Sequence, residues 1–306
     1  MVRKMKWEKL NLNYNSVNVI DGFHGAAVPQ AFQLHDSIYR IYYSARNDKN
    51  QSHIFYLTLD LSNLSIIDIC KSPILAPGNL GCFDDSGTLM SWIGKVHDEY
   101  WLYYCGWNLG KTVPFRNSIG LAVSKDGIHF ERKYYGPVVD RTYKEPHFCT
   151  NPWILIENDK FRMWYLSCVE WRIKEGEIQH RYHLKYAESL NGVDWQRNGI
   201  IAIDFADDSE YAISRPSVLK GDNAYHMWFA HRGEKYRIGY AKSKDGICWD
   251  RNDEEVGITV SEHGFDSDMI CYPAVFRHED DYYMLYNGNE YGMTGLGIAK
   301  LVEGEI

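Results

Sequence analysis

The sequence has little proline, no long apolar run and no long stretch of helix-forming residues. Only nine of its 306 residues are proline, and no segment is a run of Ala, Leu, Glu and Lys of the kind that forms long helices. No apolar run approaches the ~18 to 20 residues that a helix needs to span a bilayer. The basic start at residues 1–8 lacks the apolar stretch of a signal peptide. We therefore expect a protein without a membrane span, located in the cytoplasm.

Cysteine residues are few, their number is odd, and their spacing shows no paired motif. There are seven cysteines, and no two of them form a Cys-x-x-Cys pair. This spacing argues against a disulfide framework and against a structural zinc site, and it fits a reducing compartment. We expect reduced thiols, no bound metal and no cofactor. The seven positions are Cys70, Cys82, Cys105, Cys149, Cys168, Cys248 and Cys271.

Positive charge is in deficit. The chain has 33 Lys and Arg against 41 Asp and Glu, for a net charge of −8. Binding of a phosphate backbone requires a basic stripe, so nucleic acid is not expected as a partner. With 45% apolar and 24% charged residues, the composition is that of an ordinary folded protein. Nothing in the sequence identifies a protein partner.

Aromatic residues are abundant. The chain contains 23 Tyr, 10 Trp and 12 Phe, which together make 15% of the residues. Tyr and Trp favour the pleated, half-buried surfaces of β-sheets. The plain interpretation is an all-β core rich in aromatics. A second interpretation adds sugar binding, because ring faces stack on sugar C–H groups while the polar ring edge reaches hydroxyls.

One aromatic phrase recurs five times at intervals of about 60 residues. Each copy follows a turn rich in Asp, Asn or Gly and precedes another strand-like segment, which is a hairpin signal. Three to four short strands per unit, repeated five times, predict a five-bladed β-propeller. A sandwich of tandem hairpins is the alternative, but it would not keep this period. The copies are Tyr42-Tyr43-Ser44, Tyr103-Tyr104-Cys105, Trp164-Tyr165-Leu166, Trp228-Phe229-Ala230 and Leu285-Tyr286-Asn287.

The repeat predicts one domain over residues 1–306. The blades are expected at about residues 30–45, 88–131, 150–196, 212–250 and 270–300. A strand within residues 7–20 is expected to close the ring against the last blade, which otherwise lacks a fourth strand.

Candidate catalytic residues are the acids that precede the first strand of a blade, because these strands line the channel of a propeller. Paired carboxylates in a narrow channel can have the raised pKa that a general acid needs. The plainer alternative is that an Asp-Asp pair caps a turn and that an acid in a loop is solvated. The candidates are Asp84, Asp85, Glu145, Asp266 and Asp268.

Candidate substrate-binding residues lie at the same blade entries and just after the aromatic phrase. Arg215 sits in an apolar run, so it either pairs with a structural carboxylate or faces a ligand anion. With His231 and Arg232 it is expected to hold a phosphate or carboxylate. Asp84, His147, Arg215 and Asp268 are expected to meet in one pocket. The full set is His24, Arg46, Trp107, His147, Glu170, Trp171, Glu210, Arg215, His231, Arg232, Tyr272, Asn287, Asn289 and Glu290.

Three stretches, at residues 119–130, 236–247 and 282–289, carry a family resemblance. With them the chain resembles, over nearly its whole length, the five-bladed propeller superfamily of glycoside hydrolases and phosphorylases. That superfamily includes arabinanase-like, invertase-like and mannoside phosphorylase-like enzymes. The chain looks most like a bacterial branch that accompanies surface-polysaccharide or sugar-nucleotide genes, which is similar to the amino-terminal domain of a plant sphingolipid N-acetylglucosaminyltransferase.

The resemblance is incomplete where chemistry is concerned. The hydrolases carry an acid followed by proline at the start of the first blade, whereas this chain has Val28-Pro29 there. Ser214-Arg215-Pro216 is only a partial echo of the invertase-like Arg-Asp-Pro signature. The resemblance therefore implies an enzyme that cleaves or transfers a glycosidic bond, with hydrolysis, phosphorolysis and transfer all open.

The implied partner is a small sugar, a sugar phosphate or a sugar nucleotide. The alternatives are a sugar-binding propeller without chemistry, which would use Trp107, Trp171 and Tyr272, and a platform for protein interaction.

Overall fold

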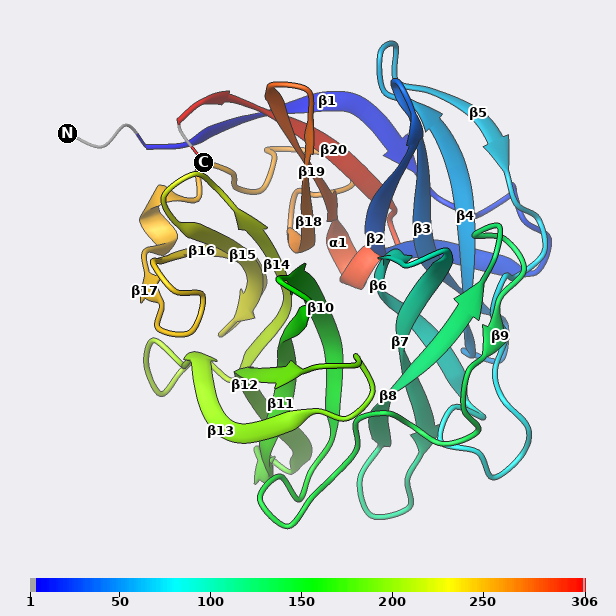
Figure 1. The fold of residues 1–306 in the computed structure, drawn as a ribbon, viewed down its shortest axis with the longest axis vertical. Coiled ribbons are helices and arrows are strands. Elements are labelled where there is room, and N and C mark those ends of the chain that lie inside the picture. The colour runs from blue at the N-terminus through cyan, green and yellow to red at the C-terminus, as the bar shows by residue number, and fades with distance from the viewer. Residues whose placement is uncertain (1–3, 305) are drawn as a thin grey trace.

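The structure is a computed structural model that describes residues 4–304 and 306, and it is built almost wholly from β-strands (Figure 1). Within these residues the only helical segments are a 3-10 turn, η1 (Asp253–Glu255), and the four-residue α1 (Asn289–Gly292). Neither approaches the length of a membrane-crossing helix. The expectation of an all-β fold is confirmed.

The first and last strands of the chain belong to one four-stranded sheet. In it β1 pairs antiparallel with β20, with Trp7 opposite Leu301, and the two strands run side by side in Figure 1. Segments distant in sequence are thereby joined in one sheet. The strand order is β1 (Lys6–Tyr14), β20 (Leu296–Glu303), β19 (Asp281–Asn287) and β18 (Cys271–His278).

A second sheet has eight strands in two groups of four. Strands within a group are antiparallel, and the groups are joined by one parallel residue pair, Ser52 with Gly87. The first group is β2 (Phe23–His35), β3 (Ile38–Asn47), β4 (Ser52–Asp60) and β5 (Ser65–Ile69). The second group is β6 (Gly87–Val96), β7 (Glu99–Leu109), β8 (Phe115–Ser124) and β9 (Glu131–Arg132).

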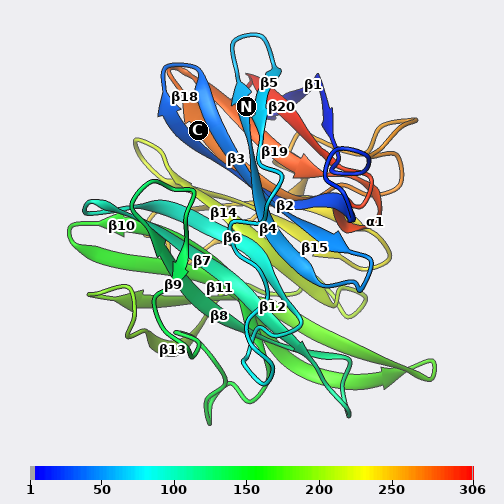
Figure 2. The same cartoon turned by 90° about the vertical axis from the view of Figure 1, so that its right-hand side faces the viewer.

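A third sheet repeats this arrangement, with Tyr182 and Ala212 as the joining pair. The hairpin of its strands β11 and β12 extends beyond the rest of the molecule (Figure 2). Its first group is β10 (Cys149–Glu157), β11 (Lys160–Lys174), β12 (Glu177–Ser189) and β13 (Gln196–Ile203). Its second group is β14 (Ala212–Lys220), β15 (Tyr225–Arg232), β16 (Tyr236–Ser243) and β17 (Asp250–Arg251).

The first strands of the four-stranded groups surround the centre of the molecule. β2 contacts β6, β6 contacts β10, β10 contacts β14, β14 contacts β18, and β18 contacts β2 (Figure 1). The repeat in the sequence predicts five separate units, whereas the structure has three sheets. The two larger sheets each contain two four-stranded groups, because one parallel residue pair joins the groups.

The repeated aromatic phrase and the repeated Asx-Gly turns bind neighbouring groups together. In three places the first ring of the phrase donates a hydrogen bond to the glycine carbonyl of the turn in the next group along the chain. These rings are fully buried, so each bond also satisfies a polar ring atom. The bonds are Tyr42 Oη to Gly127 O (2.8 Å), Tyr103 Oη to Gly192 O (2.6 Å) and Trp164 Nε1 to Gly246 O (2.9 Å).

Four of the five first strands are interrupted by a bulge before a proline. The residue before each proline has positive φ, and the register with the second strand shifts at the same point. Proline cannot donate to the ladder, and a bulge re-aims the side chain that it carries. These side chains are Val28 (φ 54°), Asn151 (φ 47°), Arg215 (φ 52°) and Tyr272 (φ 53°).

Candidate functional site

The candidate catalytic acid Asp84 is engaged in a structural ion pair. It is fully buried, accepts a hydrogen bond from Tyr104 Oη at 3.0 Å and contacts Arg132 Nη2 at 2.7 Å. Arg132 lies on β9, the outermost strand of the group. The contacts tie the loop before β6 to that outer strand.

Glu145 forms the same arrangement in the next group. Its carboxylate accepts hydrogen bonds from Tyr165 at 3.0 Å and Ser167 at 2.7 Å. It also contacts Arg197 on β13 at 3.0 Å and Lys185 at 3.2 Å. With two cations and two hydroxyls as partners, the Glu145 carboxylate has a structural role.

Glu210 and Asp266 complete the pattern. Glu210 pairs with Arg251 on β17 at 2.7 Å and with His231 Nδ1 at 2.8 Å. Asp266 pairs with Lys9 on β1 at 2.6 Å and accepts from Tyr286 at 3.2 Å. We call these four sites the carboxylate clamps: Asp84, Glu145, Glu210 and Asp266, each with a cation on the outermost strand.

The clamps predict a measurable dependence of stability on pH. Burial alone would raise the pKa of Glu210, but hydrogen bonds from Arg251 and His231 outweigh it and lower this pKa from 4.5 to about 2. A depressed folded-state pKa contributes stability above pH 4.5, and that contribution is lost as the pH falls from 4.5 towards 2. In urea unfolding over this window, Glu210→Gln should lose less stability than the unmodified protein. The exposed control Glu262→Gln should follow the unmodified protein, and parallel curves for all three would contradict the assignment.

The remaining candidate acids serve turns and the surface. Asp85 accepts from Gly81 N and Ser86 Oγ, both at 3.0 Å. Asp268 is exposed and pairs with Lys235 at 2.8 Å. Asp84 is thus tied to an outer strand and Asp268 lies at the surface, so the structure does not bring the five candidate catalytic acids into one pocket.

Arg215 lies at the centre of the molecule with 0% of its surface exposed. It donates to the carbonyls of Ser91 on β6 and Pro29 on β2 and lies 5.5 Å from the ring of Trp153. In the described residues no carboxylate lies within 4 Å of its guanidinium. It therefore cross-links three first strands through carbonyls, which neither of the two predicted roles included. His147 is half-buried in the loop before β10. Because Asp84 pairs with Arg132, Asp268 pairs with Lys235 and neither lies within 4 Å of the Arg215 guanidinium, the predicted meeting of Asp84, His147, Arg215 and Asp268 does not occur.

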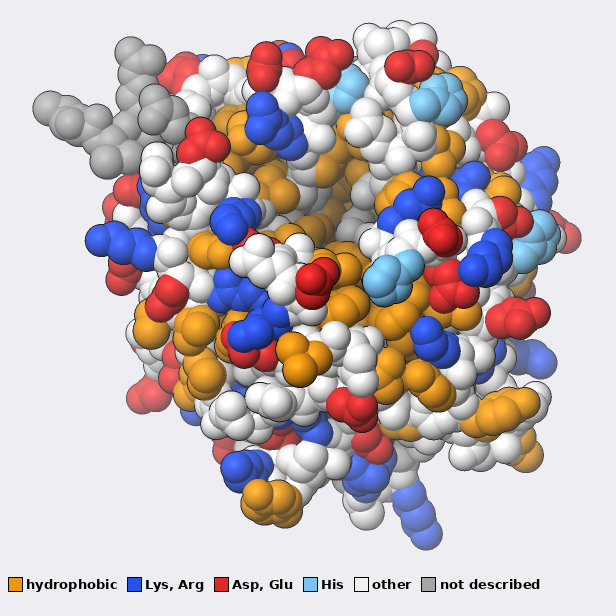
Figure 3. Space-filling view, viewed as in Figure 1, with side chains coloured by type: hydrophobic (Ala, Val, Ile, Leu, Met, Phe, Trp, Pro, Cys, Tyr) orange, Lys and Arg blue, Asp and Glu red, His pale blue; other side chains and the backbone are white. Residues whose placement is uncertain are grey.

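Four candidate substrate-binding residues do come together, in a cavity of about 410 Å³ that we call the channel cavity. It lies where β2, β18 and α1 meet (Figure 1), and this face of the molecule is hollowed near its centre (Figure 3). The four are His24, Arg46, Tyr272 and Glu290, which come from opposite ends of the chain. The other lining residues are Gly25, Ala27, Val28, Ser44, Asn50, Leu89, Tyr291, Gly292 and Met293.

Two glycines allow the close approach that forms this cavity. Gly25 has φ 78°, and a Cβ there would lie 3.3 Å from both Gly292 O and Met293 Sδ. Gly292 has φ 93°, and its Cβ would lie 2.7 Å from Asn287 Nδ2. Any larger residue would push α1 away from β2.

Glu290 and Tyr291 hold unusual backbone conformations in α1. Both have positive φ, 54° and 60°, a conformation that costs of order 1–3 kcal/mol per non-glycine residue. Both side chains are exposed at the cavity. Tyr291 is held in place by Arg232, whose Nη1 donates to its hydroxyl at 2.7 Å. Glu290 is the single carboxylate among the described residues that line the cavity.

Arg46 and Tyr272 form the polar wall and floor. Arg46 Nη1 donates to Asn50 O at 2.8 Å, and the guanidinium lies 5.5 Å from the ring of Trp107. Tyr272 packs on Tyr236 at 5.7 Å. Burial raises the pKa of Tyr272 well above 10, so its hydroxyl keeps its proton and can donate to a ligand oxygen.

Several other candidates act in the fold or at its rim. Asn287 is buried and bonds Val28 N at 2.7 Å, Asn289 accepts from Met269 N at 2.9 Å, and Trp107 donates to Ser52 Oγ at 2.7 Å. His231 and Arg232, expected to act as a pair, point different ways because side chains alternate along β15. Glu170 lies 3.7 Å from Arg172, and Trp171 packs on Phe115 at 5.4 Å.

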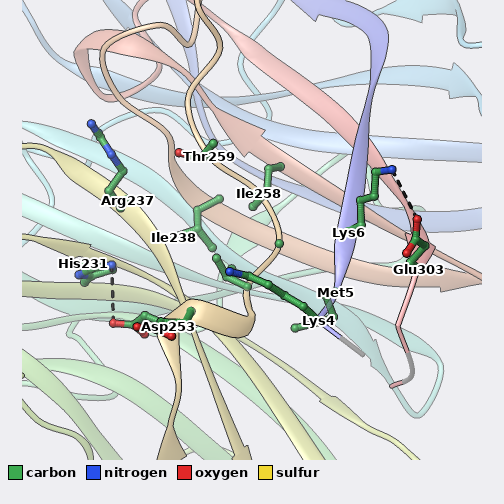
Figure 4. Close-up of a pocket in the computed structure, with 13 residues that line it drawn as sticks. Lys4, Met5, Lys6, His231, Arg237, Ile238, Asp253, Ile258, Thr259 and Glu303 are labelled. Atoms are coloured by element: carbon green, nitrogen blue, oxygen red, sulfur yellow. Dashed lines mark hydrogen bonds and ion pairs between the residues drawn. The ribbon is translucent and has the colours of Figure 1, made fainter. Parts of the chain in front are cut away.

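A larger hollow of about 680 Å³ lies between β1, β16 and η1 (Figure 4). Two pairs of its ionisable side chains contact each other. Lys6 contacts Glu303 at 3.4 Å, and His231 Nε2 lies 3.8 Å from Asp253. Of the predicted binding residues only His231 lines this hollow, whereas four of them line the channel cavity, so the channel cavity is the stronger candidate site.

Sequence reasoning named Asn289 and Glu290 of α1 but missed two neighbouring residues. Tyr291 and Met293 line the cavity, but neither stands at a repeat position. The Gly-rich run Asn287-Gly288-Asn289-Glu290-Tyr291-Gly292 was the available signal, since glycines mark close backbone approach.

The chain is similar to proteins of two kinds. No protein-family model matches it. Two Mycobacterium tuberculosis proteins, Uncharacterized protein MT1551 (strain CDC 1551 / Oshkosh) and Uncharacterized protein Rv1502 (strain ATCC 25618 / H37Rv), are each 40% identical to it over 299 residues. The match covers 97% of this chain and 99% of each relative.

Solved structures share its fold at low sequence identity. A glycoside hydrolase superposes with a TM-score of 0.73 at 18% identity, over 98% of this chain and 92% of that one. The β-1,2-mannobiose phosphorylase from Listeria innocua, in complex with β-1,2-mannobiose, gives 0.70 at 12% over 98% and 97%. A thermostable family-43 glycoside hydrolase gives 0.64 at 16% over 92% and 89%. At these identities the likeness establishes the fold alone, that of the propeller glycoside hydrolases.

Proposed function

We propose that this chain, which belongs to the family of the Mycobacterium tuberculosis proteins MT1551 and Rv1502, is a carbohydrate-active enzyme that binds its sugar in the channel cavity. The observation that carries the proposal is the convergence of His24, Arg46, Tyr272 and Glu290 on one cavity at the centre of the ring. The fold shared with glycoside hydrolases and a phosphorylase supports it.

We infer that the fold is a single propeller of five blades. Each four-stranded group corresponds to one blade, and β1 supplies the outer strand of the last blade. The closed series of contacts among β2, β6, β10, β14 and β18 supports this count. The channel cavity then lies where the first and last blades meet.

In the proposed chemistry, aromatic side chains position the sugar and one carboxylate transfers the proton. Tyr291 offers an exposed ring for stacking, and Tyr272 donates to a sugar hydroxyl. In cleavage, Glu290 would protonate the leaving oxygen while the attacking oxygen of a second substrate bonds to the anomeric carbon. In transfer, it would accept the proton of the acceptor hydroxyl as that oxygen displaces the leaving group of the donor sugar.

The number of acids in the cavity bears on the reaction class. Hydrolysis by two carboxylates requires acids ~5 to 9.5 Å apart, and Glu290 is the single acid among the described lining residues. Transfer or phosphorolysis, in which the attacking group comes from a second substrate, therefore suits the cavity better. The resemblance to proteins that accompany surface-polysaccharide or sugar-nucleotide genes supports a role in glycan metabolism. A non-catalytic sugar-binding propeller is the second candidate, and the single acid favours it too.

A ligand screen tests the proposal. Thermal unfolding is measured with mono- and disaccharides, sugar phosphates and sugar nucleotides, and a ligand at 100 times its Kd should stabilise by about 2.7 kcal/mol. Tyr291→Ala should weaken the binding of that ligand about tenfold, because a stacking ring is lost. The control Tyr135→Ala, exposed on a loop between β9 and β10, should bind normally.

The screen also separates the two candidate functions. Product formation from a stabilising ligand, followed by mass spectrometry, supports the enzyme. Binding without any product supports the sugar-binding propeller. If no ligand stabilises the protein, or if Tyr291→Ala binds as well as the unmodified protein, the channel cavity is not a sugar site.

A further inference from the structure

Arg46 is a cation without a counter-charge in the wall of the channel cavity. Its Nη1 is held by Asn50 O at 2.8 Å and Asn50 Oδ1 at 3.2 Å, and the guanidinium is packed on Trp107. In residues 4–304 and 306 no carboxylate lies within 4 Å of it. Its Nε and Nη2 donate to no acceptor in this part of the chain, and neither is sealed from solvent.

The packing around Arg46 leaves a directed donor edge. Asn50 and Trp107 hold the guanidinium of Arg46, which lines the cavity, while its Nε and Nη2 have no acceptor among the described residues and stay accessible to solvent. These two groups are the pair with which arginine binds phosphate or carboxylate in a bidentate manner. A fixed plane reduces the side-chain entropy that is lost on binding.

A second uncompensated arginine lies beneath the cavity. Arg215 is fully buried and donates to Pro29 O, and Val28, the neighbour of Pro29, lines the cavity. Nε of Arg215 is buried without an acceptor. Because charges in the interior are weakly screened, Arg215 adds positive potential to the cavity floor.

The acid in the cavity does not neutralise these arginines. Glu290 is exposed and lies more than 4 Å from both guanidinium groups. Burial lowers the pKa of Arg46, the direction expected when a cation is removed from water without a partner. By contrast, Arg132, Arg197 and Arg251 each have a carboxylate at 3.0 Å or less.

We propose that the channel cavity takes a sugar that carries a phosphate or carboxylate group, and that Nε and Nη2 of Arg46 bind this group. The proposal rests on the proposed function, because it assigns the class of sugar that the cavity binds. It makes Arg46, and not Arg215, the residue that distinguishes acidic from neutral sugars.

Calorimetric titration of matched probes tests the proposal. The probes are glucose, glucose 1-phosphate and glucuronate, the corresponding mannose compounds, and inorganic phosphate. In at least one series an acidic sugar should bind ten times or more tightly than its neutral counterpart, as expected for charge-assisted hydrogen bonds. Arg46→Ala should reduce that ratio to less than twofold. Arg46→Lys, which keeps the charge, should retain part of the ratio.

Controls separate the anion from the sugar. Arg277→Ala, at the opposite end of β18 from Tyr272, should leave every affinity unchanged. If Arg46→Ala weakens the acidic and the neutral sugar equally, Arg46 is a packing residue and this inference fails while the proposed function stands. If inorganic phosphate binds in an Arg46-dependent manner and no sugar binds, the anion site stands and the proposed function fails. If no probe binds, both fail. Preference for the phosphate or the carboxylate probe identifies the natural substituent.

Discussion

Glu145→Ala is expected to lower the free energy of unfolding by about 3–5 kcal/mol, the usual cost of removing one member of a buried ion pair. The side chain of Glu145 is only 3% exposed, and it faces Lys185 and Arg197, which are themselves largely buried. Without the carboxylate these cations lose their counter-charge, and the hydroxyls of Tyr165 and Ser167 lose their acceptor. Denaturant unfolding followed by tryptophan fluorescence measures the change.

Two further variants make this result specific to the clamp. Glu177→Ala, at the exposed tip of the β11–β12 hairpin, should change stability by less than about 0.5 kcal/mol. Glu145→Gln keeps an acceptor oxygen but not the charge. Its loss in free energy of unfolding should therefore lie between the losses of Glu145→Ala and Glu177→Ala. The contrary result would be a Glu145→Ala protein whose free energy of unfolding is within 1 kcal/mol of that of the unmodified protein but which no longer turns over a sugar identified by the screen. Glu145 would then be a catalytic acid.

Glu290→Gln is expected to reduce kcat by about 100-fold or more, the typical contribution of general acid–base catalysis. Gln has nearly the same shape as Glu, so the left-handed backbone at φ 54° and the packing of α1 should persist. Glu290 is exposed and belongs to no ion pair in the described part of the chain. Thermal stability should therefore stay within 1–2 °C of the unmodified protein. Turnover of the sugar found in the screen, measured with the melting temperature of the same samples, checks both statements.

The matched control is Glu175→Gln. Glu175 is also exposed and also has φ 54°, but it lies at the tip of the β11–β12 hairpin, outside the channel cavity. This variant should keep full activity. A Glu290→Gln protein that retains more than a tenth of the unmodified rate would remove Glu290 from the chemistry. Taken together, Glu145 should affect stability and Glu290 should affect turnover.

The expected hairpins follow from local sequence. Turn residues before each aromatic phrase set where a hairpin reverses, and alternation of side chains sets which rings are buried. The aromatic phrase and the Asx-Gly turn both recur along the chain, because the same hydrogen bond, such as that from Trp164 to Gly246 O, joins neighbouring groups. Such contacts recur with the period of the chain, so one sequence suffices to detect them.

The roles of the blade-entry acids could not be predicted in this way. Asp84, Glu145 and Asp266 occupy the positions expected of channel residues, yet each is paired with a cation on an outer strand. The partner of Asp84 is 48 residues away, and that of Asp266 is 257 residues away. The pair of Asp266 with Lys9 exists only because the two ends of the chain meet in one sheet, and no single acid shows in the sequence whether it faces a cation or the channel.

Sequence alone determined the all-β class, the period of the strands and four residues that meet in the channel cavity, His24, Arg46, Tyr272 and Glu290. It could do so because alternation, turn chemistry and repeat position are local properties. Tertiary structure decided which charged groups are neutralised and which remain free. An acid or an arginine is structural or available according to what lies within about 4 Å of it, and for Glu145 and Arg46 those neighbours are assembled only when distant strands pack together.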